Sequence, residues 1–384
     1  MDVQSFHVQV AEEALNDLHM RLLQNRWPDE IKGAGWKYGM KQSYMQELVA
    51  YWRTEFDWRA QEQKINAFAN YRAEVDALSI HFIHERGHGP HPLPLLIPHG
   101  WPSSFYEVLD IIPLLTDPAS YGGDPADAFD VIVPSLPGYG FSDRPTLPGM
   151  TTRKIASHLA QLMQGLGYER FTAHSYDVGA SVMGHMCLDF PQHLIGYHTT
   201  EPSNPKPYFG PGAPVLSDEE RLYIEYQQQW QQEEGGYDHI QRTRPQTLAY
   251  GLNDSPVGTA AWIIEKWYAW TDPANEDLER HFTKDQLLAN VSIYWLTQTI
   301  NSANRLYHER DAHPRIRLPE DRIAVPTGVA LTSQRIENPP REYVQRLYTD
   351  IRRWTKLERG GHFVMLEEPQ LLAEAIRTFF RPLR

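Results

Sequence analysis

The sequence predicts an α/β fold in which helices cover both faces of a mostly parallel central sheet. From about residue 93, short apolar runs alternate with helix-like segments. The runs that we expect to form strands are LPLLIP, FDVIVP, RFTAHS, LIGYHTT and IAVPTGVAL. A strand that is apolar throughout, rather than at alternate positions, is typical of a parallel sheet buried between two layers of helices.

Two helical regions accompany this predicted core. Residues 1–75 place apolar residues at helical spacing, for example in AEEALNDLHMRLLQNRW, and the alternating stretch AEVDALSIHFIHE then predicts a hairpin. Residues 206–315 lose the strand pattern and become helical, polar and aromatic. We therefore expect an N-terminal helical meander over 1–75, a first part of the core over 76–205, an inserted helical lid over 206–315 and a second part of the core over 316–384.

Composition excludes several classes of protein. The 384 residues are 41% apolar, which is enough for a large core and rules out a disordered chain. The net charge of −13 argues against nucleic-acid binding, and the single cysteine excludes a disulfide framework. The N-terminus lacks a signal-peptide pattern, and no apolar run nears the ~20 residues that span a bilayer. We therefore expect a soluble, cytoplasmic protein that does not associate with membranes.

The segment Ser-Tyr-Asp-Val-Gly at residues 175–179 is the most informative motif. It lies between a predicted strand and a predicted helix, and its small outer residues allow a tight turn between the two. Asp177 occupies the apex of this turn. A carboxylate at that position could attack the carbon of an epoxide or an alkyl halide and form an ester. The alternative is an aspartate that only caps the following helix.

Two further motifs favour the catalytic interpretation. The turn HGWP at residues 99–102 follows the first apolar strand, where a backbone N–H would complete an oxyanion hole. The expected donors are the backbone N–H groups of Trp101 and Val178. Near the C-terminus, the segment GGHF places His362 on a glycine-rich loop after the last predicted strand, where a general base would approach Asp177.

Together these motifs resemble the α/β-hydrolase fold, and specifically the microsomal type of epoxide hydrolase with an N-terminal meander. The segments HGWPSSFYE, PSLPGYGFS, LNDSPVG, VPTGVA and RGGHFVMLEEP are similar to that family's segments and follow in the same order. The resemblance covers nearly the whole chain and is especially close to bacterial epoxide hydrolases of secondary-metabolite pathways, such as antibiotic biosynthesis. It implies a small-molecule epoxide as substrate, no metal, no cofactor and a homodimer.

The resemblance also implies a two-step mechanism. Asp177 attacks an epoxide carbon, and His362 then activates the water that hydrolyses the resulting ester to a vicinal diol. Tyr307 falls on one of two family tyrosines that donate hydrogen bonds to the epoxide oxygen. Trp262 occupies the position of the second tyrosine. An indole N–H can donate a hydrogen bond but cannot supply a proton as a phenol can.

We expect three further contacts with the substrate. His99 and Tyr176 neighbour the predicted oxyanion hole and nucleophile, and Trp262 lies in the predicted lid. The many aromatic residues of the lid indicate an apolar substrate, and a natural-product epoxide fits the resemblance.

The acid that orients His362 is the main departure from the family pattern. The family carries Asp or Glu shortly after the VPTGVA strand, at a position that aligns with Arg335 here. Glu337 lies two residues further on and could replace that acid through a shift of the loop. Glu201 ends the LIGYHTT strand, where some haloalkane dehalogenases carry their acid, and its spacing needs no gap. The sequence therefore favours Glu201 slightly, and a chain without an orienting acid is the third alternative.

Two other functions stay open. Haloalkane dehalogenases also use an aspartate nucleophile, but they usually place a tryptophan directly after it to bind halide, and here Val178 follows. A non-catalytic binding protein on the same fold would explain Trp262 and Arg335. Such a protein would keep the pocket but lose turnover.

Overall fold

A nine-stranded sheet forms the centre of the computed structural model, which describes residues 1–203, 206–274, 277–314 and 316–384. The strand order is β1-β2-β3-β5-β4-β6-β7-β8-β9. The strands are β1 (Val3–Ser5), β2 (Asn70–Val75), β3 (Leu78–Glu85), β4 (Leu93–Leu96), β5 (Phe129–Pro134), β6 (Phe171–Ser175), β7 (Leu194–Thr199), β8 (Thr327–Leu331) and β9 (Ile351–Lys356). Neighbours from β5 to β9 pair in parallel, whereas β1, β2 and β3 pair antiparallel. The predicted mostly parallel sheet is confirmed.

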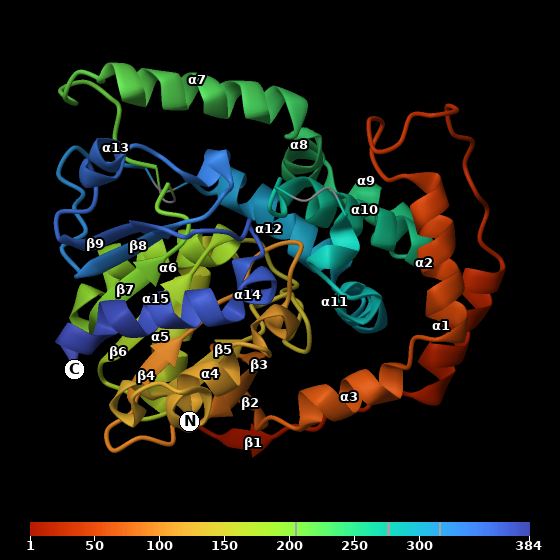
Figure 1. Cartoon of the computed structure of the whole chain (residues 1–384), viewed down its shortest axis with the longest axis horizontal. Helices are drawn as coiled ribbons and strands as arrows, with labels where there is room; N and C mark the ends of the chain where they lie inside the picture. Colours follow the sequence, from red (N-terminus) through yellow and green to blue (C-terminus); the bar gives the residue numbers. More distant parts are fainter. Residues whose placement is uncertain (204–205, 275–276, 315) are drawn as a thin grey trace.

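Helices cover both faces of this sheet (Figure 1). All residues of β5 are buried, and successive side chains enter different layers: Ile132 packs into one hydrophobic cluster, and Val131 and Val133 pack into the other. Inner strands such as β5 are largely apolar because neither of their faces meets solvent, whereas the edge strands β1 and β9 are partly polar and exposed. The helices of the first face are α5 (Thr152–Gly165) and α6 (Asp177–Asp189), and those of the second are α4 (Ile112–Thr116) and α15 (Pro369–Phe380).

The N-terminal segment is less purely helical than its pattern predicts. Its helices are α1 (Glu12–Leu23), α2 (Gln42–Thr54) and α3 (Trp58–Asn66), which run along one side of the molecule in Figure 1. However, β1 and β2 also lie within residues 1–75, because this end of the chain pairs with the hairpin of β2 and β3. Asp76 and Ala77 form the hairpin turn with φ values of 48° and 62°, the positive values that suit a two-residue hairpin.

Helices also fill the segment between β7 and β8 that the sequence predicts as a lid. They are α7 (Asp218–Glu233), α8 (Gly236–Thr243), α9 (Pro245–Leu252), α10 (Pro256–Trp270), α11 (Lys284–Thr297) and α12 (Ile300–Ala312). A capping box of Ser217 and Glu220 begins α7, which spans the top of the molecule in Figure 1. Arg346 donates to Glu220 over 2.7 Å and so ties the start of α7 to the C-terminal part of the core.

The C-terminal ends of the parallel strands bring distant parts of the sequence together. Asp177 follows β6 and Glu201 follows β7, while Glu337 follows β8 and His362 follows β9. Because these strands run in parallel, the residues after them share one edge of the sheet. The helices α13 (Arg341–Gln345) and α14 (Val364–Glu367) flank β9. In the described part of the chain, no helix has the length and apolar character needed to cross a membrane.

Gly179 allows α6 to pack closely against the chain that follows β4. A Cβ atom at Gly179 would lie 2.3 Å from the carbonyl oxygen of Pro98, which is backbone and cannot rotate away. We therefore expect Gly179→Ala to lower the free energy of unfolding by about 1–3 kcal/mol, as overpacking does. Chemical denaturation would measure this change.

Gly251→Ala is the matched control, because Gly251 lies in α9 and a Cβ atom there would meet nothing within 4 Å. This variant should be as stable as the parent, or more stable by up to about 1 kcal/mol, since alanine favours a helix over glycine. Equal stability of the two variants would contradict the close approach at Gly179.

Candidate active site

The tight turn predicted at residues 175–179 is present between β6 and α6. Asp177 is the first residue of α6, and its φ is 49°, which is rare for a residue other than glycine and marks a constrained turn. The N-cap of this helix is Tyr176, so Asp177 is not the simple helix cap that the sequence left as an alternative. A Cβ atom on Gly100 would lie only 2.4 Å from Asp177 Oδ1, which explains the glycine in the HGWP turn.

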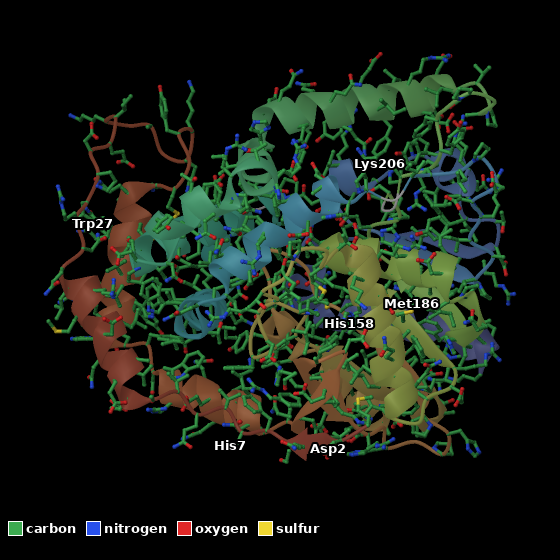
Figure 2. All side chains as sticks on the ribbon, turned by 180° about the vertical axis from the view of Figure 1, so that it is seen from behind. Asp2, His7, Trp27, His158, Met186 and Lys206 are labelled. Carbon is green, nitrogen blue, oxygen red and sulfur yellow. The ribbon has the colours of Figure 1, made fainter. Side chains whose placement is uncertain are left out.

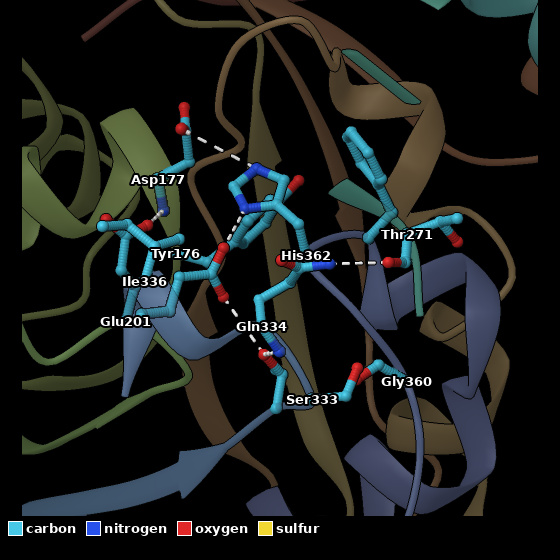
Figure 3. Close-up of polar contacts among 12 residues, drawn as sticks. Tyr176, Asp177, Glu201, Thr271, Ser333, Gln334, Ile336, Gly360 and His362 are labelled. Atoms are coloured by element: carbon cyan, nitrogen blue, oxygen red, sulfur yellow. Dashed lines mark hydrogen bonds and ion pairs between the residues drawn. The ribbon is translucent and has the colours of Figure 1, made fainter. Parts of the chain in front are cut away.

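Two backbone N–H groups hold the Asp177 carboxylate. The N–H of Trp101 donates to Oδ1 over 2.7 Å, and the N–H of Val178 also donates to this carboxylate. These are the two donors that the sequence predicts for an oxyanion hole. The other oxygen, Oδ2, lies 3.7 Å from Nε2 of His362 (Figure 3).

The His362 imidazole faces Asp177 from a loop that is fixed by backbone contacts. The N–H of His362 donates to the carbonyl oxygen of Trp270 over 2.9 Å, and the N–H of Gly360 donates to Asp272 over 2.8 Å. Gly360 has a φ of 100°, a conformation that favours glycine. The two glycines before His362 thus serve the turn that directs the imidazole at Asp177.

Glu337 holds the other side of the imidazole. Its Oε1 forms a short hydrogen bond with Nδ1 of His362, and its Oε2 accepts from the hydroxyl of Thr332 over 3.2 Å. Glu337 ends a single 3₁₀ turn, η6 (Arg335–Glu337), which carries the acid past the aligned position at Arg335. Arg335 instead lies with its guanidinium 4.2 Å from the ring centroid of Tyr226.

The slight preference of the sequence for Glu201 as the orienting acid is corrected by this geometry. Glu201 accepts a hydrogen bond from the backbone N–H of Asp177 over 2.6 Å and so holds the nucleophile turn rather than His362 Nδ1 (Figure 3). The reason is its position at the end of β7, directly beside β6, where the nearest donor is the first N–H of α6. In the structure the loop is shifted so that Glu337 reaches the imidazole, which is the other possibility that the sequence leaves open.

The surrounding carboxylates keep His362 protonated. Burial alone would lower the pKa of His362, but the charge and hydrogen bond of Glu337, followed by the charges of Asp177 and Glu201, raise this pKa to about 10. Burial, together with the charges of Glu337 and Asp177, raises the pKa of Glu201 to about 8. Before any ester forms on Asp177, its carboxylate therefore faces a positively charged imidazolium.

Two tyrosines face this charged cluster from the helices between β7 and β8. Tyr307 comes from α12, as predicted, and Tyr237 comes from α8; their ring centroids lie 6.1 Å apart. Tyr237 stacks on Trp101 at 4.9 Å, with the ring planes 1° from parallel, and Tyr307 packs against the same indole at 5.9 Å. Burial raises the pKa of both phenols, and the charge of Asp177 adds to this, so both keep a proton to donate.

Tyr237 is the functional residue that the sequence did not reveal. It follows the acidic run QQEEGG, which the sequence pattern assigns to a solvated lid face. The first three residues of the run are exposed, but the chain then turns inward: Gly235 is buried, as are Asp238 and Gln241 on the helix that follows. An aromatic residue directly after a glycine pair, at the start of a short helix, was the available signal.

Trp262 is not among the residues that line the cavity with Asp177, so the predicted substrate contact has no support from this geometry. Its indole N–H donates to the side chain of Gln241 over 2.9 Å, and this bond joins α10 to α8. The aromatic residue thus supports the helix that carries Tyr237 and does not stand in the place of a phenol.

His99 and Tyr176 support the site from behind and do not line the cavity either. His99 is fully buried; its Nδ1 lies 2.9 Å from the carbonyl oxygen of Gly100, and its Nε2 accepts the N–H of Leu136. The Tyr176 hydroxyl donates to the buried Glu107, and its ring packs edge-on to His362 at 5.6 Å. Both side chains are already occupied by protein contacts, so the structure gives their predicted substrate contacts no support.

A cavity of about 730 Å³ gives access to these groups. Its wall includes the carboxylates and imidazole described above together with both phenols, and Trp230 and Trp270 add aromatic surface. Several charged residues complete the lining. The sequence predicts an apolar wall, whereas the observed wall is partly aromatic and partly charged.

Three side chains in this cavity could surround a cation or a water molecule. Potential ligand atoms of Asp177, Glu201 and His362 lie within 4.8 Å of one another. Among the described residues, these three side chains are close enough together to coordinate a metal ion. A water fits this donor set, because the imidazole Nε2 can exchange a proton with it while the carboxylates accept its hydrogens. The raised pKa of His362 disfavours a cation, since a metal ligand must be the neutral imidazole.

Comparisons with known proteins agree with this geometry. Two family models match the chain, "Epoxide hydrolase N terminus" over residues 3–108 and "alpha/beta hydrolase fold" over residues 94–234. The chain is 41% identical over 381 residues to a Stigmatella aurantiaca protein named for epoxide hydrolase activity, a match that covers 99% of this chain and 85% of the relative. It is 36% identical over 404 residues to epoxide hydrolase 1 of Oryctolagus cuniculus, with 98% and 88% covered.

Solved structures give the same result. The juvenile hormone epoxide hydrolase of the silkworm Bombyx mori is 29% identical, with a TM-score of 0.85 and coverage of 100% of this chain and 94% of that protein. The epoxide hydrolase of Aspergillus niger is 26% identical, with a TM-score of 0.86 and coverage of 100% and 97%. The chain therefore belongs to the epoxide hydrolase family, on the α/β-hydrolase fold.

Proposed function

We propose that this protein hydrolyses epoxides to vicinal diols through an ester formed on Asp177. One observation carries the proposal: a carboxylate at a constrained turn lies 3.7 Å from a buried imidazole, in a cavity that also holds two phenols. The names of the relatives support the same reaction class. The proposed roles are nucleophile for Asp177, base for His362, orienting acid for Glu337 and proton donors for Tyr237 and Tyr307.

In the first step, Asp177 Oδ2 attacks one epoxide carbon and the C–O bond to the ring oxygen breaks. The electron pair of that bond goes to the ring oxygen, which would be a poor leaving group as a free alkoxide. Tyr237 and Tyr307 donate hydrogen bonds to this oxygen, and one phenol supplies the proton that makes it a hydroxyl. Two protonated phenols beside a carboxylate suit this ring opening.

In the second step, a water molecule attacks Cγ of the Asp177 ester while His362 Nε2 takes its proton. Alkylation removes the negative charge of Asp177, so one of the charges that raise the pKa of His362 disappears and the imidazole can lose its proton. The negative charge of the tetrahedral intermediate develops on Oδ1, where the Trp101 N–H already donates. Collapse of this intermediate breaks the Cγ–Oδ2 bond, and the leaving oxygen takes up the proton of the intermediate's hydroxyl, so that a diol with the former Oδ2 atom leaves and the carboxylate is restored. The proton on His362 then returns to the phenolate formed in the first step.

Glu201 has a different proposed role from Glu337. Its hydrogen bond to the Asp177 N–H fixes the turn, and its place in the three-residue cluster lets it hold the attacking water. Burial beside two other carboxylates raises the pKa of Glu201, so this side chain takes up a proton more readily than an ordinary glutamate and can exchange one with that water.

The alternative functions have weaker support. The binding-protein alternative depended on Trp262 and Arg335, but Tyr237 supplies the second phenol and Glu337 supplies the acid. For dehalogenation, Val178 after the nucleophile has no indole to offer a halide, whereas two phenols suit an alkoxide. A cytoplasmic location, a homodimer and a role in a natural-product pathway stay predictions from the sequence.

A single turnover in ¹⁸O-labelled water tests the covalent mechanism. With styrene oxide and excess enzyme, the first diol should contain unlabelled oxygen, and the label should enter the peptide that holds Asp177. His362→Gln should trap the ester, which adds the mass of the substrate to the protein, whereas Asp177→Asn should form no adduct. Label in the diol of the first turnover would mean direct attack by water and would refute the ester.

Glu337→Gln and Glu201→Gln separate the two acids. Glu337→Gln should slow ester hydrolysis about 10²-fold or more, because the imidazole loses both its orientation and the charge that stabilises the imidazolium. Ester hydrolysis needs neutral His362, so its rate rises with pH through the pKa of this group. Because loss of Glu337 lowers that pKa, the rise should move to lower pH, as stopped-flow measurements of the ester would record. Glu201→Gln should give a smaller shift, and a larger shift than for Glu337→Gln would reverse the two roles.

Phenylalanine variants test the two phenols. Tyr237→Phe and Tyr307→Phe should each lower the rate of ester formation about 10- to 10³-fold, and the double variant should lower it further. Pre-steady-state measurement of alkylation isolates this step from hydrolysis. Trp262→Phe is the aromatic comparison: it keeps both phenols but loses the bond to Gln241 that supports α8, so it should slow alkylation less than Tyr237→Phe does. A Trp262→Phe defect as large as that of Tyr237→Phe would restore Trp262 to the site.

A further inference from the structure

The part of the cavity away from Asp177 is rich in cations. Lys206, Arg242, Arg310 and Arg317 line it, although the whole chain has a net charge of −13. The proposed reaction has no use for these charges, because an epoxide is neutral. Those cations that are not balanced by neighbouring carboxylates therefore point to a feature of the substrate outside the ring.

The aspartates in this region are already shared between two arginines. Asp238 lies 2.8 Å from Arg242 and 3.2 Å from Arg310, and Asp311 lies 3.0 Å from Arg242 and 3.5 Å from Arg310. These four side chains balance one another. Arg317, at the same side of the cavity, lies 3.8 Å from Asp321.

Lys206 is the charge left over. Among the described residues, no carboxylate lies within ion-pair distance of its amine. Lys206 is exposed to solvent and lies below α7 in Figure 2. Partial desolvation of its amine and the nearby charge of Arg310 lower the pKa of Lys206, so an anion beside it would favour the charged form.

The positions of these residues give a direction to the cavity. Arg310 follows Tyr307 by one turn of α12, and its guanidinium lies 5.1 Å from the ring centroid of that tyrosine. The charge of Asp177 contributes to the raised pKa of Tyr307, whereas the charges that shift the pKa of Lys206 are those of Arg310 and Asp238. A substrate with its ring between Asp177 and Tyr307 would thus extend past Arg310 toward Lys206.

We infer that the preferred substrate is an epoxide whose far end carries a carboxylate, which pairs with Lys206 beside Arg310. This inference rests on the proposed epoxide hydrolysis and names its substrate class. One unpaired cation among balanced neighbours matches a monoanion better than a doubly charged phosphate. The wall near Asp177 is aromatic, as the predicted apolar substrate requires, and the charged group belongs to the opposite end.

A series of ω-epoxyalkanoic acids of increasing chain length, each compared with its methyl ester, tests the inference. At the chain length that spans the cavity, the acid should have a kcat/KM about five- to tenfold above that of the ester, as one partly exposed ion pair provides. The difference should lie in KM and should shrink with added salt, which screens the pair. A terminal phosphate in place of the carboxylate would identify a doubly charged ligand if it is preferred, and would overturn the monoanion.

Variants of Lys206 identify the cation. Lys206→Met should raise KM for the acid about five- to tenfold and remove its advantage over the ester, whereas Lys206→Arg should retain that advantage. Lys356→Met removes a positive charge at the exposed end of β9, outside the cavity, and should leave the ratio of acid to ester unchanged. Equal kcat/KM for acid and ester at every length would overturn the inference while diol formation upholds the proposed function. Failure to convert any epoxide in either series would refute both.

Discussion

The close packing around Asp177 is the constraint on which the rest of the site depends. The left-handed φ at Asp177 directs its carboxylate toward the chain that follows β4, and Gly100 and Gly179 leave no Cβ in the way. That approach brings the Trp101 N–H within 2.7 Å of the carboxylate. Any side chain at these glycines would separate the nucleophile from the donor that stabilises its intermediate, so neither position is free to vary even though neither glycine reacts.

The second organising principle is a charge balance that changes during the proposed reaction. Three carboxylates, those of Asp177, Glu201 and Glu337, surround one imidazole, and burial makes their charges act strongly on each other. In the free protein this favours an imidazolium beside a nucleophilic carboxylate. Esterification of Asp177 would remove one of these charges and so lower the pKa of His362, toward the neutral form that a general base needs. The same residues thus suit both steps without moving.

The sequence predicted most of the fold and half of the site, for physical reasons. Apolar strands and a small-residue turn are local patterns, so the sheet, Asp177 and His362 could be read from them. The partner of His362 depends on whether one 3₁₀ turn carries Glu337 past Arg335, which alignment of the strand cannot reveal. Tyr237 was missed because its function depends on packing between α8 and a distant indole, and the acidic run before it conceals the inward turn.

Trp101 joins these separate parts into one unit. Its backbone N–H holds Asp177, while its indole stacks on Tyr237 and packs against Tyr307. Trp101 thus contacts both the proposed nucleophile and the proposed proton donors, and it links their positions directly. Trp262 acts on the same unit from the other side, because its bond to Gln241 fixes α8.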